Sequence, residues 1–224
     1  MAERYFAAHA QEWDAIRSLH LPEAEVERAM LALLRDAPLG KMLDIGTGTG
    51  RMIELFGGSA QSVIAIDNSP EMLRLARAKL LESETASGPG LIQKTELNNL
   101  PLANGAVDSV ILHQVLHFAQ HPEAVLAEVS RVLKTAGTVL IADFAAHDRE
   151  DLRTEYAHAR LGFSDDSIKH WLAASKLELA QTRTLDGGEL TVKIWVAKKP
   201  VIPSLRPDSD QLSSRTQNLK RASA

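Results

Sequence analysis

Short apolar runs alternate with segments of helical periodicity between residues 41 and 144, and this alternation constrains the fold most strongly. A short apolar run bounded by turn residues is typical of a buried strand, whereas apolar residues three and four apart indicate one face of a helix. Strands and helices in alternation form right-handed crossovers, so we expect a mostly parallel sheet with helices on both faces. The predicted strands are 41–45, 62–66, 91–94, 107–112 and 138–144, and the predicted helices between them are 51–56, 69–80 and 122–133.

The two ends of the chain depart from this pattern. Helices are predicted at 2–18, 22–36, 149–161 and 165–174. Two further strands, 178–185 and 189–198, are separated by Asp186-Gly187-Gly188, which is a hairpin signal. We therefore expect a doubly wound, Rossmann-like α/β sheet of seven strands that ends in an antiparallel hairpin.

Composition divides the chain into three parts. Residues 1–37 are expected to form an N-terminal helical cap, and residues 38–199 the α/β domain. Residues 200–224 are rich in Ser, Pro, Arg, Gln and Asn with few large apolar residues, so this tail is expected to be disordered.

Charge and cysteine content narrow the function classes. The net charge is -4, with acids and bases interspersed, so the positive field of a nucleic-acid-binding protein is missing. The absence of cysteine excludes a thiolate nucleophile and cysteine-ligated zinc, and it fits a reducing compartment. Residues 1–10 lack the apolar core of a secretory signal, and no apolar run approaches the ~18 residues of a membrane span. We therefore predict a cytoplasmic protein with no membrane span and no nucleic-acid partner.

A glycine-rich loop follows the first predicted strand. Gly46, Gly48 and Gly50 allow a sharp turn there and let a ligand lie against bare main chain. In a doubly wound sheet this loop lies at the carboxyl end of a strand, where ligands bind, and Asp67 ends the next strand beside it. A carboxylate at that place can accept hydrogen bonds from both hydroxyls of a ribose. The combination predicts a nucleoside site, and the alternative is a tight turn followed by a helix cap.

The residues around the loop indicate which nucleoside binds. A dinucleotide-binding loop would have its third glycine at position 51, which is Arg51 here, and no Lys-Ser/Thr pair follows as in a phosphate-binding loop. Asp44 immediately precedes the loop. A carboxylate there is poorly placed beside a pyrophosphate but well placed for an ammonium group, which S-adenosylmethionine carries and NAD lacks.

Four segments in sequence order resemble the successive motifs of class I S-adenosylmethionine-dependent methyltransferases, over about residues 40–145. They are LDIGTGTG, IAIDNSPEML, LNNLPLANGAVDSVILHQVLHF and EVSRVLKTAGTVLIADF. A closer likeness is to the methyltransferase domains fused to ArsR-type regulators, on YFAAHAQEWDAIRSLHLPEAEVE, HARLGFSDDSI and GGELTVKIWVAKK. The DNA-binding half of those regulators is not in this sequence, which predicts a stand-alone relative or a fragment.

This resemblance implies S-adenosylmethionine as cofactor and a set of residues that contact it. The loop and its preceding aspartate would hold the methionine part, the acid after the second strand the ribose, and the residues after the third strand the adenine. The sequence has Thr95-Glu96 where the family usually has Gly-Asp, so the geometry there is expected to differ. The implied positions are Asp44, Gly46, Thr47, Gly48, Gly50, Asp67, Asn68, Met72, Glu96, Leu97, His113 and Gln114.

Histidines supply the candidate bases. His113 and His117 follow the fourth strand on the binding side and are the leading catalytic candidates, ahead of His121, His147 and His158. The alternative is that these histidines are surface or capping residues. The spacing of four residues also resembles a helical metal pair, but no Glu-x-x-His accompanies it, so no metal site is predicted.

Aromatic residues at both ends are candidate lids over an acceptor. They are Tyr5, Trp13, Tyr156 and His158, and the alternative is that they pack helices onto the core. We expect methyl transfer to a small-molecule acceptor, because Leu112-His113-Gln114-Val115 stands where base-modifying enzymes of this fold carry an Asn-Pro-Pro-Tyr-type motif. A sensor that binds the cofactor without turnover stays open, and an NAD-dependent enzyme is disfavoured by Arg51 and Asp44.

Overall fold

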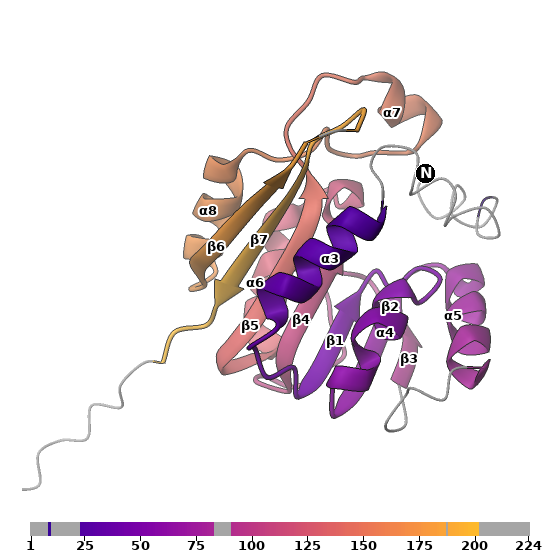
Figure 1. The fold of residues 1–224 in the computed structure, drawn as a ribbon, viewed down its shortest axis with the longest axis vertical. Coiled ribbons are helices and arrows are strands. Elements are labelled where there is room, and N and C mark those ends of the chain that lie inside the picture. The colour runs from indigo at the N-terminus through magenta and orange to yellow at the C-terminus, as the bar shows by residue number, and fades with distance from the viewer. Residues whose placement is uncertain (1–8, 10–22, 83–90, 187, 202–224) are drawn as a thin grey trace, which may run out of the picture.

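A single seven-stranded sheet forms the centre of the molecule (Figure 1). The computed structural model describes residues 9, 23–82, 91–186 and 188–201. The strand order is β3-β2-β1-β4-β5-β7-β6. The strands are β1 (Lys41–Ile45), β2 (Ser62–Asp67), β3 (Leu91–Lys94), β4 (Val107–His113), β5 (Leu133–Phe144), β6 (Glu178–Leu185) and β7 (Val192–Lys198).

Pairing within the sheet is parallel on one side and antiparallel on the other. Strands β1 to β5 are joined by parallel pairs, whereas β7 pairs antiparallel with both β5 and β6. This arrangement confirms the predicted doubly wound fold with an antiparallel C-terminal hairpin.

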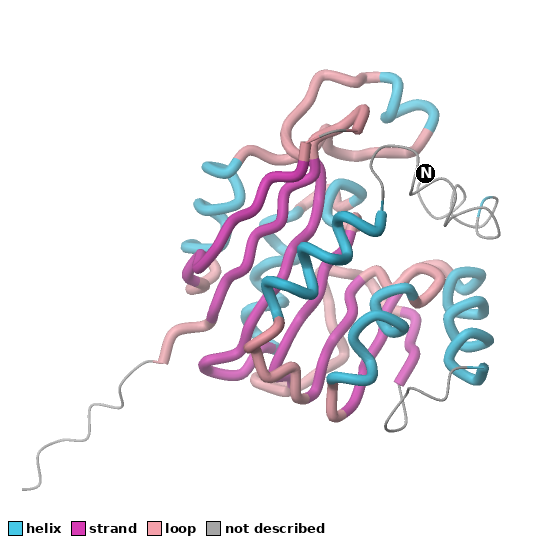
Figure 2. The backbone as a smooth tube through the Cα atoms, in the orientation of Figure 1, coloured by secondary structure: helices cyan, strands magenta, loops and turns pink. Residues whose placement is uncertain are grey.

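Helices cover both faces of the sheet (Figure 2). They are α3 (Glu23–Leu34), α4 (Arg51–Phe56), α5 (Pro70–Glu82), α6 (Pro122–Val132), α7 (Asp151–Glu155) and α8 (Asp165–Ala174), with short 3-10 turns η1 (Gly57–Ser59) and η2 (Leu116–Phe118). Side chains of a strand alternate between the faces. Leu43 and Ile45 therefore pack with α6 and α8, while Met42 packs with α3 and α4 on the other face.

Helix α3 belongs to this core. Val26, Met30 and Leu34 recur at helical spacing and are buried against the sheet. Its Glu27 also binds Arg51, the first residue of α4, through two hydrogen bonds of 2.6 and 2.8 Å. This pair joins the N-terminal helix to the end of the glycine loop. The predicted helix 2–18, apart from residue 9, and the predicted tail 200–224, apart from residues 200 and 201, lie outside the described residues.

One predicted helix is wrong. Residues 149–161 do not form a continuous helix, because α7 ends at Glu155 and an irregular segment follows. Ala157 has φ 57° and Gly162 has φ 69°, conformations that a right-handed helix excludes. A Cβ on Gly162 would lie 2.0 Å from the carbonyl oxygen of Ala145, so the chain approaches the end of β5 more closely than helix packing allows.

The starts of two strands also differ from the prediction. β5 begins at Leu133, directly after α6, rather than at Thr138. β7 begins at Val192 rather than at 189, so the connection between β6 and β7 is longer than the predicted turn.

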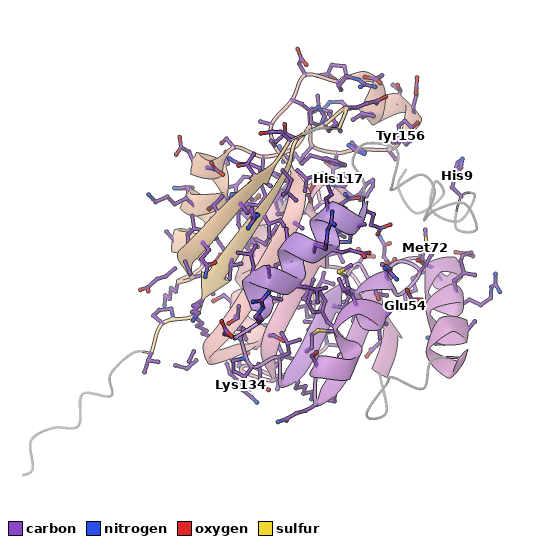
Figure 3. All side chains as sticks on the ribbon, in the orientation of Figure 1. His9, Glu54, Met72, His117, Lys134 and Tyr156 are labelled. Carbon is purple, nitrogen blue, oxygen red and sulfur yellow. The ribbon has the colours of Figure 1, made fainter. Side chains whose placement is uncertain are left out.

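The carboxyl ends of β1 to β5 meet at one edge of the sheet, which we call the carboxyl edge. Its strands end at Ile45, Asp67, Lys94, His113 and Phe144. Figure 3 shows Met72, His117 and Tyr156 toward this end of the molecule and Lys134, near the start of β5, at the opposite end. The topology thus brings the glycine loop and the histidines after β4 to the same edge.

Candidate cofactor and acceptor site

The glycine loop folds back over the end of β2. The backbone N–H groups of Gly46 and Thr47 both donate to the carbonyl oxygen of Ile66, each at 2.9 Å. Gly46, Gly48 and Gly50 have φ values of 68°, 54° and 91°. L-residues with a side chain rarely adopt such values, so the turn requires glycine at these positions.

The loop also lies against the segment that follows β4. A Cβ on Gly46 would lie 2.2 Å from Cγ2 and 2.8 Å from Cβ of Val115. Both distances are well below van der Waals contact, and valine is too short to swing away. The absence of a side chain at position 46 therefore lets the two connections pack together.

Asp67 links the loop to α5. One carboxylate oxygen accepts the N–H of Gly48 at 2.9 Å, and the other accepts the N–H of Ser69 at 2.9 Å. Burial raises the pKa of the Asp67 carboxyl, and the backbone N–H donors of Ser69, Gly48 and Asn68 oppose that shift. An ionised carboxylate offers about four lone-pair positions. Three backbone donors leave about one of these positions, so the carboxylate can still accept a ribose hydroxyl.

Asp44 lies beneath the same loop. It is 1% exposed, and the hydroxyl of Thr47 donates to its Oδ2 at 2.6 Å. A buried carboxylate beside a glycine-rich loop suits a ligand that carries an ammonium group for the carboxylate and polar atoms for the main chain of the loop. The donors and acceptors present therefore fit the amino-acid part of S-adenosylmethionine.

The remaining predicted cofactor positions are spread along the carboxyl edge. Met72 is buried in the first turn of α5, and Asn68 is half-buried beside Asp67. The N–H of Thr95 donates to the carbonyl oxygen of Asp67 at 3.0 Å, which holds the connection after β3 against β2. Glu96 in that connection has an exposed side chain, whereas Leu97 packs against the core.

The end of β4 brings two more predicted positions to the loop. His113 pairs with Ala142 of β5 and is buried. Gln114 has φ 49°, and its N–H donates to the carbonyl oxygen of Ala142 at 2.7 Å. Strained backbone of this kind is concentrated at functional sites.

His117 forms a buried pair with Asp143, a residue that the sequence analysis did not single out. Nδ1 of His117 lies 2.7 Å from Oδ1 of Asp143, with side chains 2% and 0% exposed. Three backbone N–H groups also donate to this carboxylate, from Leu116 at 3.0 Å, His117 at 3.2 Å and Phe144 at 2.8 Å. The capping alternative is therefore wrong for His117. The sequence signal that was available is an aspartate at the end of a strand expected beside the histidine-bearing one.

Three neighbouring rings and two backbone hydrogen bonds enclose His117. The ring centroids of Phe118, His158 and Phe144 lie 4.0, 4.2 and 5.1 Å from that of His117. The N–H groups of Ala159 and Arg160 donate to the carbonyl oxygen of His117 at 3.0 and 2.9 Å. The irregular segment after α7 is thereby fixed over the connection that follows β4.

The lid candidates fall into two groups. His158 packs against His117, and Tyr156 lies beside His158 with ring centroids 6.5 Å apart. Tyr5 and Trp13 lie outside the described residues.

His121 differs from His117. Its side chain is 69% exposed and contacts Glu123 at 3.2 Å, just before α6. Residues 113–121 are not one helix, so the spacing of four does not make a helical metal pair. Within the described ranges, no group of three or more His, Cys, Asp or Glu side chains is arranged to hold a metal ion.

The profile of a methyltransferase domain family matches residues 43–141, which contain the loop, both aspartates and the histidines after β4. A phosphatidylethanolamine N-methyltransferase of Cereibacter sphaeroides is 31% identical over 173 residues, covering 75% of this chain and 84% of that protein. The chain belongs to the class I S-adenosylmethionine-dependent methyltransferases. The predicted family is thereby confirmed.

Other methyltransferase relatives differ in their acceptors and their length. A malonyl-[acyl-carrier protein] O-methyltransferase of Laribacter hongkongensis is 35% identical over 134 residues. The match covers 57% of this methyltransferase and only 44% of the Laribacter protein. The YcgJ protein of Bacillus subtilis has the same fold, with a TM-score of 0.69 at 16% identity over 80% of this chain and 100% of that one.

Among the helices that the structure describes, none is both long and apolar enough to cross a bilayer.

Proposed function

We propose that this methyltransferase binds S-adenosylmethionine at the glycine loop and transfers its methyl group to a small-molecule acceptor. The observation that carries the proposal is the hydrogen bond from Gly48 N–H to the buried carboxylate of Asp67, because it joins the loop and the ribose-binding acid into one site. The cofactor supplies an electrophilic methyl group on a sulfonium, and the protein contributes position and electrostatics.

Each part of the site has a separate task. The carboxylate of Asp67 accepts a hydrogen bond from a ribose hydroxyl, and Met72 packs against the adenosine. The main chain of Gly46 to Gly50 and the carboxylate of Asp44 hold the charged amino-acid end. The rings near His117 limit the access of water to the reacting atoms.

The acceptor does not follow from the relatives. The relatives named above carry O-methyltransferase and N-methyltransferase names, so they support the reaction type and different acceptor atoms. A small molecule is favoured by the missing base-modifying motif after β4 and by the net charge of -4.

Calorimetric titration tests the cofactor assignment. We expect heat on addition of S-adenosylmethionine or S-adenosylhomocysteine and none with NADH. Binding of NADH in place of both would refute the proposal. The likeness to domains fused to ArsR-type regulators supports a second candidate, a cofactor sensor. Binding without methyl transfer to phenol, quinol, alcohol or amine acceptors would favour the sensor.

A further inference from the structure

We infer that Asp143 is a positioning residue that presents His117 as the base for an acceptor hydroxyl. The inference rests on the proposed function and goes beyond it in naming the acceptor class and the residue behind the base. It starts from the arrangement of donors around one buried carboxylate.

Both oxygens of the Asp143 carboxylate accept hydrogen bonds. Its Oδ2 receives the N–H groups of Leu116 and His117, and its Oδ1 receives the N–H of Phe144. The fourth neighbour is Nδ1 of His117, on Oδ1. Four donors use all of the roughly four lone-pair positions that an ionised carboxylate offers. Nδ1 must therefore carry the hydrogen, because a lone pair at Nδ1 would face a carboxylate oxygen.

This tautomer leaves the lone pair on the other ring nitrogen, Nε2. No hydrogen bond joins Nε2 to another residue of the described part of the chain. A histidine whose Nδ1 is held by a buried carboxylate and whose Nε2 is available has the arrangement of a general base with its orienting group. The ring is also fixed from behind, since its own backbone N–H binds the same carboxylate.

The pair lies beside the proposed cofactor site. His117 is two residues from Val115, which packs against Gly46 of the loop. Asp143 follows Ala142, the strand partner of His113. The base is thus held at the ends of β4 and β5, and β4 pairs with β1, the strand that the glycine loop follows.

The chemistry of methyl transfer then selects the acceptor. A neutral amine can attack first and lose its proton to water later, whereas a hydroxyl is a poor nucleophile until its proton leaves. A histidine that is held in position as a base therefore points to a hydroxyl acceptor. The O–H bond breaks as the O–C bond forms, the proton goes to Nε2 of His117, and the electron pair of the broken C–S bond stays on sulfur.

The first test reads the tautomer without any acceptor. Long-range proton–nitrogen correlation spectra of the ¹⁵N-labelled protein should show His117 with hydrogen on Nδ1. In Asp143→Asn, one amide oxygen cannot replace two carboxylate oxygens, and an NH₂ group turned toward Nδ1 would move the hydrogen to Nε2. An Nε2–H tautomer in the unsubstituted protein would overturn the inference, even if Asp143→Asn failed to fold.

The second test separates this inference from the proposed function. Asp143→Asn and His117→Gln should bind S-adenosylhomocysteine within about twofold of the unsubstituted protein, because the hydrogen bonds of the Asp143 carboxylate go to the segment after β4 and to Phe144, and not to the loop. Transfer of labelled methyl to catechol, hydroquinone and simple alcohols should fall by about 10²- to 10⁴-fold in both variants. His170→Gln, on the exposed face of α8, is the matched control and should change neither quantity.

The outcomes are distinct. Unchanged transfer in His117→Gln, or transfer to ethanolamine and none to any hydroxyl, would overturn the inference and leave the cofactor site intact. Loss of cofactor binding in the unsubstituted protein would overturn the proposed function instead.

Discussion

The two halves of the carboxyl edge differ in the kind of contact that stabilises them. Around β1 and β2 the contacts are made largely by main chain, with Gly46, Thr47 and Gly48 donating through their N–H groups. Around β4 and β5 the central contact joins two side chains, His117 and Asp143, that lie 26 residues apart in sequence. One half depends on backbone conformations, and the other depends on strand register.

This difference explains what each half tolerates. The positive φ of the loop glycines strains any L-residue, and at Gly46 there is also no room for a Cβ, so the loop is sensitive to the smallest substitution. The pair of His117 in η2 and Asp143 in β5 is instead sensitive to the loss of either partner, since the remaining group would be buried without its hydrogen bond.

The largest expected effect is on the loop. Gly46→Ala should lower the free energy of unfolding by about 2–5 kcal/mol, because a left-handed backbone costs an L-residue about 1–2 kcal/mol and overpacking costs about 1–3 kcal/mol. Denaturant unfolding followed by circular dichroism measures this change. Calorimetric titration should show weaker binding of S-adenosylmethionine in the folded fraction.

Two controls sharpen this prediction. Gly58→Ala should change stability by less than about 0.5 kcal/mol, because nothing lies within 4 Å of a Cβ there and its φ is not positive. Adding Val115→Ala to Gly46→Ala should recover part of the loss by removing the overlapping methyl groups. Equal stability of the single and double variants would contradict the close packing of the two connections.

The half of the carboxyl edge around β1 and β2 was predictable from the sequence. The half around β4 and β5 was predictable only in part. Glycine spacing and the acid that ends β2 identify the loop, because each glycine marks a local conformation. His117 was a candidate, but its partner Asp143 comes from a strand whose register with β4 is set by the whole sheet. The break after α7 was missed for a similar reason. Local sequence favours a longer helix there, but Ala157 has φ 57°, and the N–H groups of Ala159 and Arg160 donate to His117, which is distant in sequence.

A smaller effect is expected from the protonation of Asp67. Burial raises the pKa of Asp67 above the usual aspartate value. The charged form is the better acceptor for a ribose hydroxyl. Cofactor affinity should therefore fall on acidification, beginning at a higher pH than for an exposed aspartate. Bound cofactor should in turn lower the pKa of Asp67.

Asp67→Asn tests this dependence. The variant should bind S-adenosylmethionine about 1–3 kcal/mol more weakly at neutral pH and lose the acid-dependent change, as titrations across pH would show. Asp166→Asn, an exposed change in the first turn of α8, is the matched control and should leave both unchanged. A pH dependence that persists in Asp67→Asn would assign it to another group.

The smallest effect is expected at Gln114. This residue lies between His113, the last residue of β4, and Val115, which packs against Gly46 of the loop. Its φ of 49° is strained for a side-chain-bearing residue, so Gln114→Gly should raise the free energy of unfolding by about 0.5–1 kcal/mol. Lys176→Gly offers a matched comparison. Lys176 has φ 58° just after α8, where its N–H donates to Ala173 at 3.0 Å in a helix-ending turn that favours glycine. Both variants should gain stability, but only Gln114→Gly should lose cofactor affinity, because Gln114 is one of the implied cofactor positions and the variant removes its side chain. Equal affinity in the two variants would mean that the Gln114 side chain has no part in binding.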